Sequence, residues 1–208
     1  MAGGRFISFE GIDGSGKSTQ ARRLAAALTH AGHRVIATRE PGGSSGAEEI
    51  RRLLLEGATD RWSAETEILL FTAARRDHLE RTIRPALDRG AWVVTDRFAD
   101  STRVYQGVTR GDLRAVVDRL HDLMIGVEPD LTVLIDIDPA EGLTRARARA
   151  GAEMRFEDMG IAVQARMRAA FLDLAAAAPA RFAVIDGAQP ADAVAAQVLA
   201  AVTARLGG

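Results

Sequence analysis

Short apolar runs and longer segments with helical spacing alternate along the chain. The short runs are the length of strands and rich in the apolar side chains found in a buried sheet. They are Arg5–Glu10, Arg34–Thr38, Ala91–Thr95, Leu131–Asp136 and Phe182–Ile185. Each connection is long enough to hold a helix, which favours crossovers between parallel strands. The pattern therefore predicts an α/β fold with a five-stranded parallel sheet and helices on both faces.

Several helical segments carry start or stop signals. The segment after the first strand has apolar residues at helical spacing, namely Ala21, Leu24, Ala25 and Leu28, and we expect it to end at Gly32. The segment after the fourth strand begins with Asp138, Pro139 and Glu141, a combination typical of a capped helix start. Another helix should end in the alanines at 175–178, just before Pro179.

The last helix, about Ala191–Leu206, is interpreted as a cover for the sheet. Its apolar stripe is predicted to be Ala195, Leu199, Val202 and Leu206. With no internal repeat or linker in view, residues 1–208 are expected to form a single domain.

Composition narrows the class of protein. The net charge of -1 does not indicate nucleic acid or an anionic membrane as a partner, and the absence of cysteine excludes disulfides and thiolate chemistry. No apolar run reaches the roughly 18 residues of a membrane span, and a strand begins almost at the N-terminus, without room for a signal peptide. We expect a soluble cytoplasmic protein. The four histidines show no ligand spacing and are interpreted as surface or helix residues.

The first strand is followed by Gly-x-x-x-x-Gly-Lys-Ser, the pattern of a phosphate-binding loop. Its lysine, Lys17, is the one lysine among 27 basic residues, which suggests a need for a compact ammonium group. The alternative, a glycine-rich turn without a ligand, is much less common for this pattern after a strand. Predicted contacts to ATP are Gly11, Ile12, Asp13, Gly14, Ser15, Gly16, Lys17, Ser18 and Thr19. A P-loop NTPase fold follows.

Polar residues also follow the second and third strands, where ligands gather in open α/β sheets. Arg39-Glu40-Pro41 follows one, and Asp96-Arg97 ends the other. An Asp-Arg dipeptide is often a surface ion pair, but a strand end beside a phosphate loop favours a site. Asp96 is placed to order Mg²⁺ as a Walker-B-like acid, with Ser18 as a second metal ligand, or it pairs with Arg97.

These motifs, in this order and spacing, resemble the bacterial thymidylate kinase family of P-loop nucleoside monophosphate kinases. The likeness extends over nearly the whole chain. It rests on the phosphate loop, on residues 39–43, and on Asp96-Arg97 followed by Ser101-Thr102 and Tyr105-Gln106. Phe71, Ala74 and Arg75 fit the family's base-binding helix, whereas residues 107–110 depart from the glycine-rich stretch found there.

The resemblance implies an enzyme that transfers the γ-phosphoryl group of ATP to dTMP, with Mg²⁺, and that forms a homodimer. The phosphate of the acceptor is already anionic, so its attacking oxygen needs no strong base. Positioning and charge neutralisation suffice for the transfer. Lys17, Mg²⁺ and arginines would hold the donor, and Asp13 would lie near the acceptor. The residues implied for dTMP binding are Asp13, Arg39, Glu40, Pro41, Phe71, Arg75, Arg97, Ser101, Thr102, Tyr105 and Gln106.

A lid is expected near residues 145–160. Arg145 and Arg149 share a helical face, and Arg155 follows in a glycine-bearing stretch that could close over the phosphates. We take Arg149 and Arg155 as the catalytic lid arginines; a solvated helix face carrying charge is the alternative. Phe71, too, has an alternative role as a core residue, since only the resemblance makes it a base-stacking residue.

Rival functions differ in testable ways. Another nucleotide kinase would keep the phosphate loop and change the acceptor pocket. A regulatory GTPase needs an Asn-Lys-x-Asp motif. This sequence cannot contain that motif, because its only lysine lies in the phosphate loop. An ATPase module that binds nucleic acid would need a broad basic face and typically a paired Asp-Glu after a Walker B strand. The third strand ends in Asp96-Arg97 and the fourth in Asp136-Ile137-Asp138, so this alternative is weaker.

Overall fold

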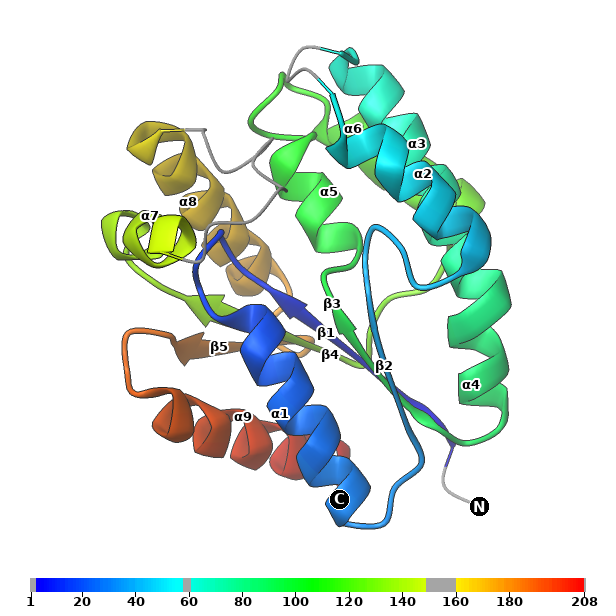
Figure 1. Ribbon diagram of the computed structural model, residues 1–208, viewed down its shortest axis with the longest axis vertical. Coiled ribbons are helices and arrows are strands. Elements are labelled where there is room, and N and C mark those ends of the chain that lie inside the picture. The colour runs from blue at the N-terminus through cyan, green and yellow to red at the C-terminus, as the bar shows by residue number, and fades with distance from the viewer. Residues whose placement is uncertain (1–2, 58–60, 149–159, 208) are drawn as a thin grey trace.

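The computed structural model describes residues 3–57, 61–148 and 160–207 (Figure 1). Its strands are β1 (Arg5–Glu10), β2 (Val35–Arg39), β3 (Trp92–Asp96), β4 (Leu131–Asp136) and β5 (Phe182–Asp186). Its helices are α1 (Lys17–His30), α2 (Ser45–Leu55), α3 (Ala64–His78), α4 (Arg84–Asp88), α5 (Ala99–Tyr105), α6 (Arg114–Met124), α7 (Pro139–Ala148), α8 (Ile161–Ala177) and α9 (Ala191–Leu206). A π-helical turn, Leu79–Ile83, joins α3 to α4.

The strands form one parallel sheet in the order β2-β3-β1-β4-β5. The predicted fold class is confirmed, and the predicted strands agree with the observed ones within one residue at each end. β1 lies at the centre, paired with β3 through Phe6 and Val93 and with β4 through Ile7 and Leu131. All five carboxyl ends therefore lie at one edge of the sheet, the edge that carries the phosphate loop.

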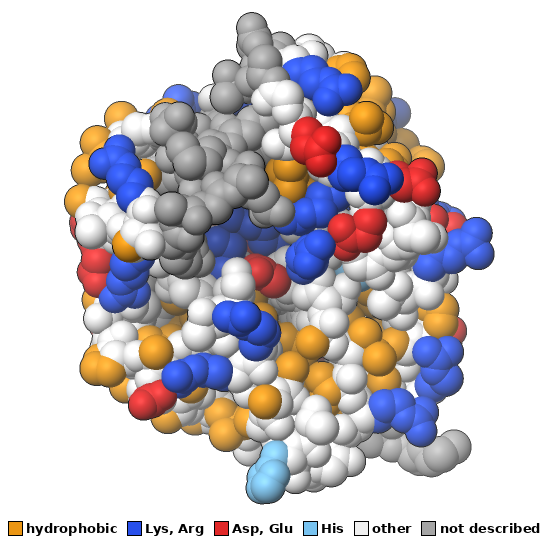
Figure 2. Space-filling view, in the orientation of Figure 1, with side chains coloured by type: hydrophobic (Ala, Val, Ile, Leu, Met, Phe, Trp, Pro, Cys, Tyr) orange, Lys and Arg blue, Asp and Glu red, His pale blue; other side chains and the backbone are white. Residues whose placement is uncertain are grey.

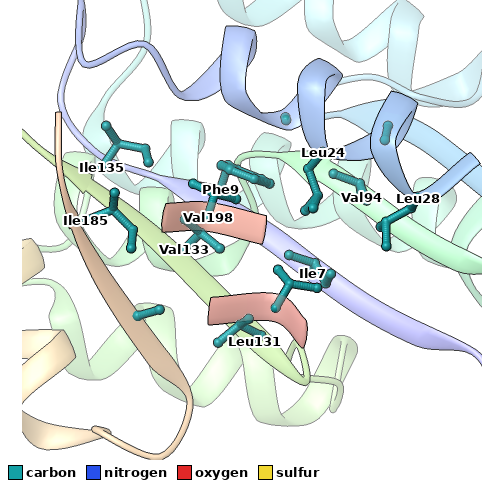
Figure 3. Close-up of a cluster of buried hydrophobic side chains, with 14 of the residues drawn as sticks. Ile7, Phe9, Leu24, Leu28, Val94, Leu131, Val133, Ile135, Ile185 and Val198 are labelled. Atoms are coloured by element: carbon teal, nitrogen blue, oxygen red, sulfur yellow. The ribbon is translucent and has the colours of Figure 1, made fainter. Parts of the chain in front are cut away.

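One face of the sheet is covered by α1 and α9 (Figure 1). Alternate residues of the central strands, such as Ile7 and Phe9, point to this side, because successive strand side chains face opposite ways. Leu24 and Leu28 of α1 and Val198 of α9 pack on them (Figure 3). The predicted apolar face of α1 is confirmed in full, since Ala21 and Ala25 are also buried.

The other face is covered by two groups of helices. Near β4 and β5, Met167 and Phe171 of α8 pack against Leu134 and Phe182. Near β3, the turn that joins α3 to α4 packs against Phe6 and Val93 together with Phe98 at the start of α5. This second group positions α3 and α5, which both contribute residues to the cavity at the carboxyl edge of the sheet.

The predicted helix ends are confirmed, but the apolar stripe predicted for α9 needs correction. Gly32 adopts a positive φ of 91° just after α1, and Asp138 accepts the Ala140 N–H as an N-cap of α7. The stripe predicted for α9 is wrong in part. Val194, Val198 and Val202 are its buried residues, whereas Leu199 is 40% exposed. The predicted stripe followed a spacing of four residues through Ala195 and Leu199. The β-branched valines one position before each of these residues pack against the sheet instead.

Within the part of the chain that the structure describes, no helix is long and apolar enough to cross a membrane.

Candidate active site

A cavity of about 600 Å³ opens above the carboxyl ends of β1, β2 and β3. Every residue predicted from the resemblance to contact dTMP lines it, from Asp13 to Gln106. Gly16, Lys17 and Ser18 of the phosphate loop and Asp96 also line it, so the predicted donor and acceptor residues share one space. Figure 2 shows basic and acidic side chains gathered around a hollow on this face.

The phosphate loop connects β1 to α1 and depends on its glycines. Gly11, Gly14 and Gly16 have φ values of 140°, 77° and 93°, a region that other residues rarely adopt. A Cβ on Gly14 would lie 1.9 Å from the carbonyl oxygen of Gly142, so α7 packs directly on the loop. The loop leads into the N-terminus of α1, where free backbone N–H groups favour an anion.

Lys17 lies buried at the first residue of α1. Its ammonium group donates to the carbonyl oxygen of Ile12 at 3.1 Å and lies 3.7 Å from Asp13 Oδ1. Burial, followed by the charge of Arg97, lowers the pKa of Lys17 to about 8. The ammonium is thus predominantly charged at neutral pH, and a phosphate nearby would raise this pKa again.

Asp13 is paired with an arginine, Arg97. Arg97 Nη2 donates to Asp13 Oδ1 at 2.6 Å, and the Tyr105 hydroxyl donates to Oδ2 at 3.0 Å. Burial alone would raise the pKa of Asp13, but Arg97 and Lys17 hold it below its usual value. The carboxylate therefore stays ionised and fixes two groups from the acceptor side of the cavity.

Arg97 has an unusual backbone. Its φ of 72° makes it the one non-glycine residue in the described part of the chain with a positive φ. Such strain costs of order 1–3 kcal/mol and persists where the surroundings fix the residue. Here Asp13, Tyr105 and Ser101 hold the guanidinium, with the Ser101 hydroxyl 3.0 Å from Nη1. The side chain is turned toward the phosphate loop.

Asp96 does not pair directly with Arg97, the alternative that the sequence allowed. Its Oδ1 is buried and has no hydrogen-bond partner among the described residues. Mg²⁺ in phosphoryl-transfer sites takes one or two protein oxygens, with phosphates and waters completing the shell. Asp96 and Ser18, both at the cavity, suit that pattern. The described residues contain no cluster of three or more His, Cys, Asp or Glu suited to a metal. A Mg²⁺ site completed by phosphates and waters does not need such a cluster.

The acceptor half of the cavity is built around Arg75 of α3. Its Nε donates to Glu40 Oε2 at 2.7 Å, and its Nη2 donates to Thr102 Oγ1 at 2.9 Å and to the Phe98 carbonyl at 3.2 Å. Phe71, one turn earlier on α3, lines the cavity and belongs to none of the hydrophobic core clusters. The side chain is half-buried, so its alternative role as a core residue is not supported.

Glu10, the last residue of β1, was not predicted as part of the site. Its Oε1 accepts the Phe98 and Ser101 N–H groups at 2.7 and 3.3 Å, and its Oε2 accepts the Ser101 hydroxyl at 2.6 Å. It thereby caps the start of α5, which carries Ser101, Thr102 and Tyr105. Burial, then the Asp100 carboxylate, raises the pKa of Glu10 to about 7.

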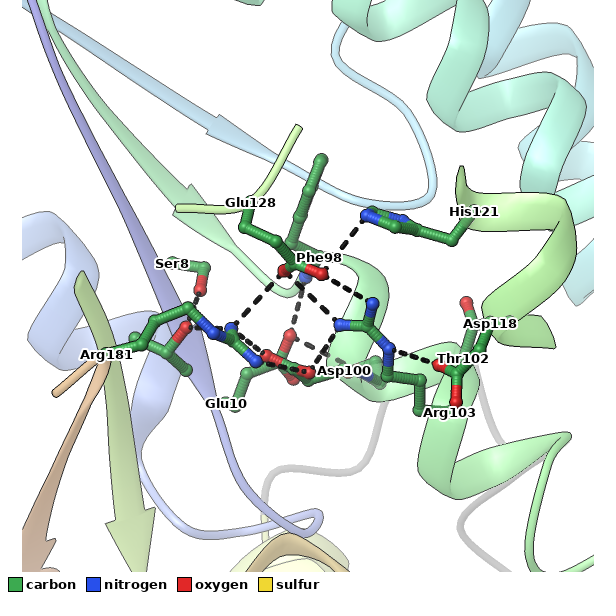
Figure 4. Close-up of polar contacts among 12 residues, drawn as sticks. Ser8, Glu10, Phe98, Asp100, Thr102, Arg103, Asp118, His121, Glu128 and Arg181 are labelled. Atoms are coloured by element: carbon green, nitrogen blue, oxygen red, sulfur yellow. Dashed lines mark hydrogen bonds and ion pairs between the residues drawn. The ribbon is translucent and has the colours of Figure 1, made fainter. Parts of the chain in front are cut away.

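A second charged network anchors α5 from its far side (Figure 4). Arg103 donates to Asp100, Asp118 and Glu128, and Arg181, before β5, donates to Asp100 at 2.6 Å. Asp100 and Arg103 are almost fully buried. The partners come from α6, the loop before β4 and the end of the α8–β5 connection, so nothing local in the sequence indicated them.

Two of the four histidines are buried and face glutamates, which the sequence did not indicate. His78 lies on α3 and is 3.0 Å from Glu40; His121 lies on α6 and is 3.2 Å from Glu128. Arg51 of α2 also lines the cavity, where it donates to the Pro41 carbonyl at 2.6 Å.

Most of the predicted lid, with Arg149 and Arg155, lies outside the described residues. Arg145 is described, and its guanidinium is held by other groups: Nη1 donates to the Gly187 carbonyl at 2.9 Å, and Nη2 donates to Glu141.

The glycine loop, its lysine and the arginine-rich acceptor wall define a P-loop nucleotide-binding protein with room for a second substrate beside the phosphates. Comparison with known proteins is specific. The thymidylate kinase family model matches residues 9–198. The chain belongs to the thymidylate kinase family, and the resemblance predicted from the sequence is confirmed.

Individual relatives agree over their full lengths. The thymidylate kinase of Ruegeria pomeroyi is 68% identical over 203 residues, which cover 98% of this chain and 96% of that protein. The thymidylate kinase of Caulobacter vibrioides is 54% identical over 100% of both chains. The crystal structure of thymidylate kinase from Ehrlichia chaffeensis has a TM-score of 0.79 at 36% identity, with 97% of this chain and 99% of that chain covered.

Proposed function

We propose that this chain is a dTMP kinase that transfers the γ-phosphoryl group of ATP to dTMP, giving ADP and dTDP. The observation that carries the proposal is the single cavity in which Lys17 and Ser18 of a phosphate loop face the acceptor wall of Arg75, Arg97 and Phe71. A hydrolytic ATPase has no need of that wall. Family membership agrees with this assignment, and the cytoplasm, where nucleotides are made, is the proposed location.

The chemistry asks the protein for position and charge. An oxygen of the dTMP phosphate attacks the γ-phosphorus, and the bond from that phosphorus to the bridging oxygen of ADP breaks. The attacking oxygen is already anionic, so no strong base is required. We assign Lys17 to the donor phosphates and Arg97, with Arg39, to the acceptor phosphate, where paired donors suit phosphate oxygens. Asp13 keeps Arg97 in place.

Mg²⁺ is proposed as the cofactor, held by Ser18 and by the unpaired oxygen of Asp96. When bound, it would neutralise charge that develops on the phosphates. Arg149 and Arg155 are proposed to reach the transferred phosphoryl group from the lid, and this assignment stands on the resemblance alone.

The base is proposed to stack on Phe71, with Arg75 and Thr102 at its polar edge. Tyr105 would pack under the deoxyribose, and Gln106 would be a further contact. A base stacked on an aromatic ring is held without regard to its identity, so the choice of thymine falls to the polar groups at its edge.

A homodimer is proposed as the assembled state. The helix α3 packs against both α2 and α6, and large apolar side chains are exposed on all three helices. They are Leu53, Leu69, Val116, Leu123 and Met124. Such an apolar surface is typical of a protein interface. Sedimentation should give a dimer, and Leu123→Glu should shift it toward monomer, whereas Ile161→Glu on α8 serves as a control. A wild-type monomer at micromolar concentration would overturn the assignment.

The test of the activity is ADP formation from ATP and Mg²⁺ with dTMP, dUMP, dCMP, dGMP, AMP or no acceptor. Turnover that depends on dTMP is expected. Turnover with a different monophosphate would keep the donor half and refute the base assignment, and hydrolysis that is independent of any acceptor would favour the ATPase alternative.

A further inference from the structure

His78 is buried in a chain of hydrogen-bonded side chains that ends at the acceptor wall. It is 0% exposed and lies on the last turn of α3, beside Glu40 and Thr38. Its Nδ1 lies 3.0 Å from Glu40 Oε1, and its Nε2 lies 2.8 Å from Thr38 Oγ1. Glu40 Oε2 accepts a hydrogen bond from the Nε of Arg75, which lines the cavity. Glu40 is therefore the one residue between the ring and Arg75 in this chain of hydrogen bonds.

The partners of the ring settle which nitrogen donates. Nδ1 faces a carboxylate oxygen, which can only accept, so Nδ1 carries a proton. In the neutral ring Nε2 then accepts from the Thr38 hydroxyl. The site is also sterically closed, because a Cβ on Gly43 would lie 2.3 Å from Nε2. His78 therefore has one orientation, and its Nδ1–H occupies one of the two oxygens of Glu40.

Occupying that oxygen has a consequence for Arg75. Glu40 meets the guanidinium through a single oxygen, at Nε, which leaves Nη2 to bond Thr102 and the Phe98 carbonyl. Among the described residues, Nη1 has no hydrogen-bond acceptor. A carboxylate released from His78 would instead take the guanidinium with both oxygens, the geometry that arginine prefers. The carboxylate would then compete with Thr102 for Nη2 of Arg75, and the guanidinium would rotate and move Nη1.

We propose that His78 is a positioning residue for acceptor binding, acting through Glu40 to fix the orientation of Arg75 and Thr102. The proposal rests on the proposed function, since it assumes that these two side chains bind the acceptor nucleotide. It assigns this positioning to the hydrogen bond that Nδ1 donates to Glu40; the hydrogen bond that Nε2 accepts from Thr38 holds the ring but does not reach the cavity.

Two substitutions separate positioning from packing. His78→Asn places an amide N–H near the position of Nδ1, and His78→Gln places one near the position of Nε2, so both delete the ring and each keeps one hydrogen bond. The apparent KM for dTMP should stay within about threefold of wild type in His78→Asn and rise about tenfold or more in His78→Gln, the range expected for losing a bond to a charged group. The KM for ATP should not change in either variant.

Thr38→Val is the matched control, because it removes the partner of Nε2 and retains the shape of the side chain. Its KM for dTMP should match that of wild type. Circular dichroism and thermal unfolding would report whether each variant folds. If His78→Gln did not fold, His78→Leu would replace it, because it also removes the hydrogen bond to Glu40, and its KM for dTMP should be at least tenfold higher than that of wild type.

Equal KM values for dTMP in His78→Asn and His78→Gln, with an active wild type, would overturn the proposal and leave the proposed function standing. A wild type without dTMP-dependent turnover would overturn the proposed function itself.

Discussion

The donor and acceptor sides of the cavity are built in different ways. On the donor side one continuous segment, Gly11–Ser18, shapes the phosphate site through backbone conformation and the start of α1. On the acceptor side the groups come from the end of β2, from α3 and from the β3–α5 turn, and they are joined by ion pairs such as Arg75 with Glu40, 35 residues away. The donor side therefore depends on local backbone geometry, and the acceptor side depends on partners that are distant in the sequence.

The largest effect expected is from Lys17→Met, which breaks the donor side alone. Losing one preorganised charge at a developing anion costs about 10²–10³-fold in kcat. Binding of dTMP, measured by titration calorimetry, should change little, because Lys17 is assigned to the donor phosphates. Wild-type turnover in this variant would refute the donor assignment, and an unfolded variant would show that the buried ammonium is structural.

Phe71→Ala breaks the acceptor side alone. Removing a stacked ring costs about 1–3 kcal/mol per base, so the Kd for dTMP should rise by about 10- to 100-fold. Titration with ATP should give the wild-type Kd. Equal losses for both nucleotides would indicate that Phe71 supports the fold, contrary to its half-buried position outside the core clusters.

Glu10 connects the two sides, and its removal should affect turnover least. Burial, and then the Asp100 carboxylate, raises the pKa of Glu10 from its ordinary value of 4.5 to about 7 in the folded protein. Between those values the folded protein binds a proton that the unfolded chain has released, so stability must fall as pH rises. Glu10→Gln should remove this slope, of up to about 1.4 kcal/mol per pH unit, from the free energy of unfolding.

Chemical denaturation of wild type and Glu10→Gln at several pH values between 4.5 and 7 would measure this difference. The variant keeps an oxygen for the Phe98 N–H, so α5 should remain capped and kcat should stay within about threefold. Parallel stability curves for the two proteins would show that Glu10 does not titrate in that window.

The difference between the two sides also explains what the sequence could predict. The sheet, the phosphate loop and the α7 start were all within reach, because strand hydrophobicity, glycine spacing and capping residues are local signals. The predicted acceptor residues do line one cavity, but the sequence supplied them through resemblance, since no spacing rule places Phe71 beside Arg97.

What the sequence did not indicate is how these residues are held. Arg97 meets Asp13 across 84 positions, and the positive φ that aims it is not encoded by any glycine. Glu10 reads as the end of a strand, although it caps a helix 88 residues later. His78 reads as an ordinary helix residue until β2 is placed against it. Such partners depend on tertiary packing, which a single sequence does not display.

The most direct test of the account is the identity of the products. Purified protein with ATP, Mg²⁺ and dTMP should yield ADP and dTDP in equal amounts, as resolved by anion-exchange chromatography. ADP with inorganic phosphate and no dTDP would contradict the account, because the acceptor wall would then play no part in the reaction.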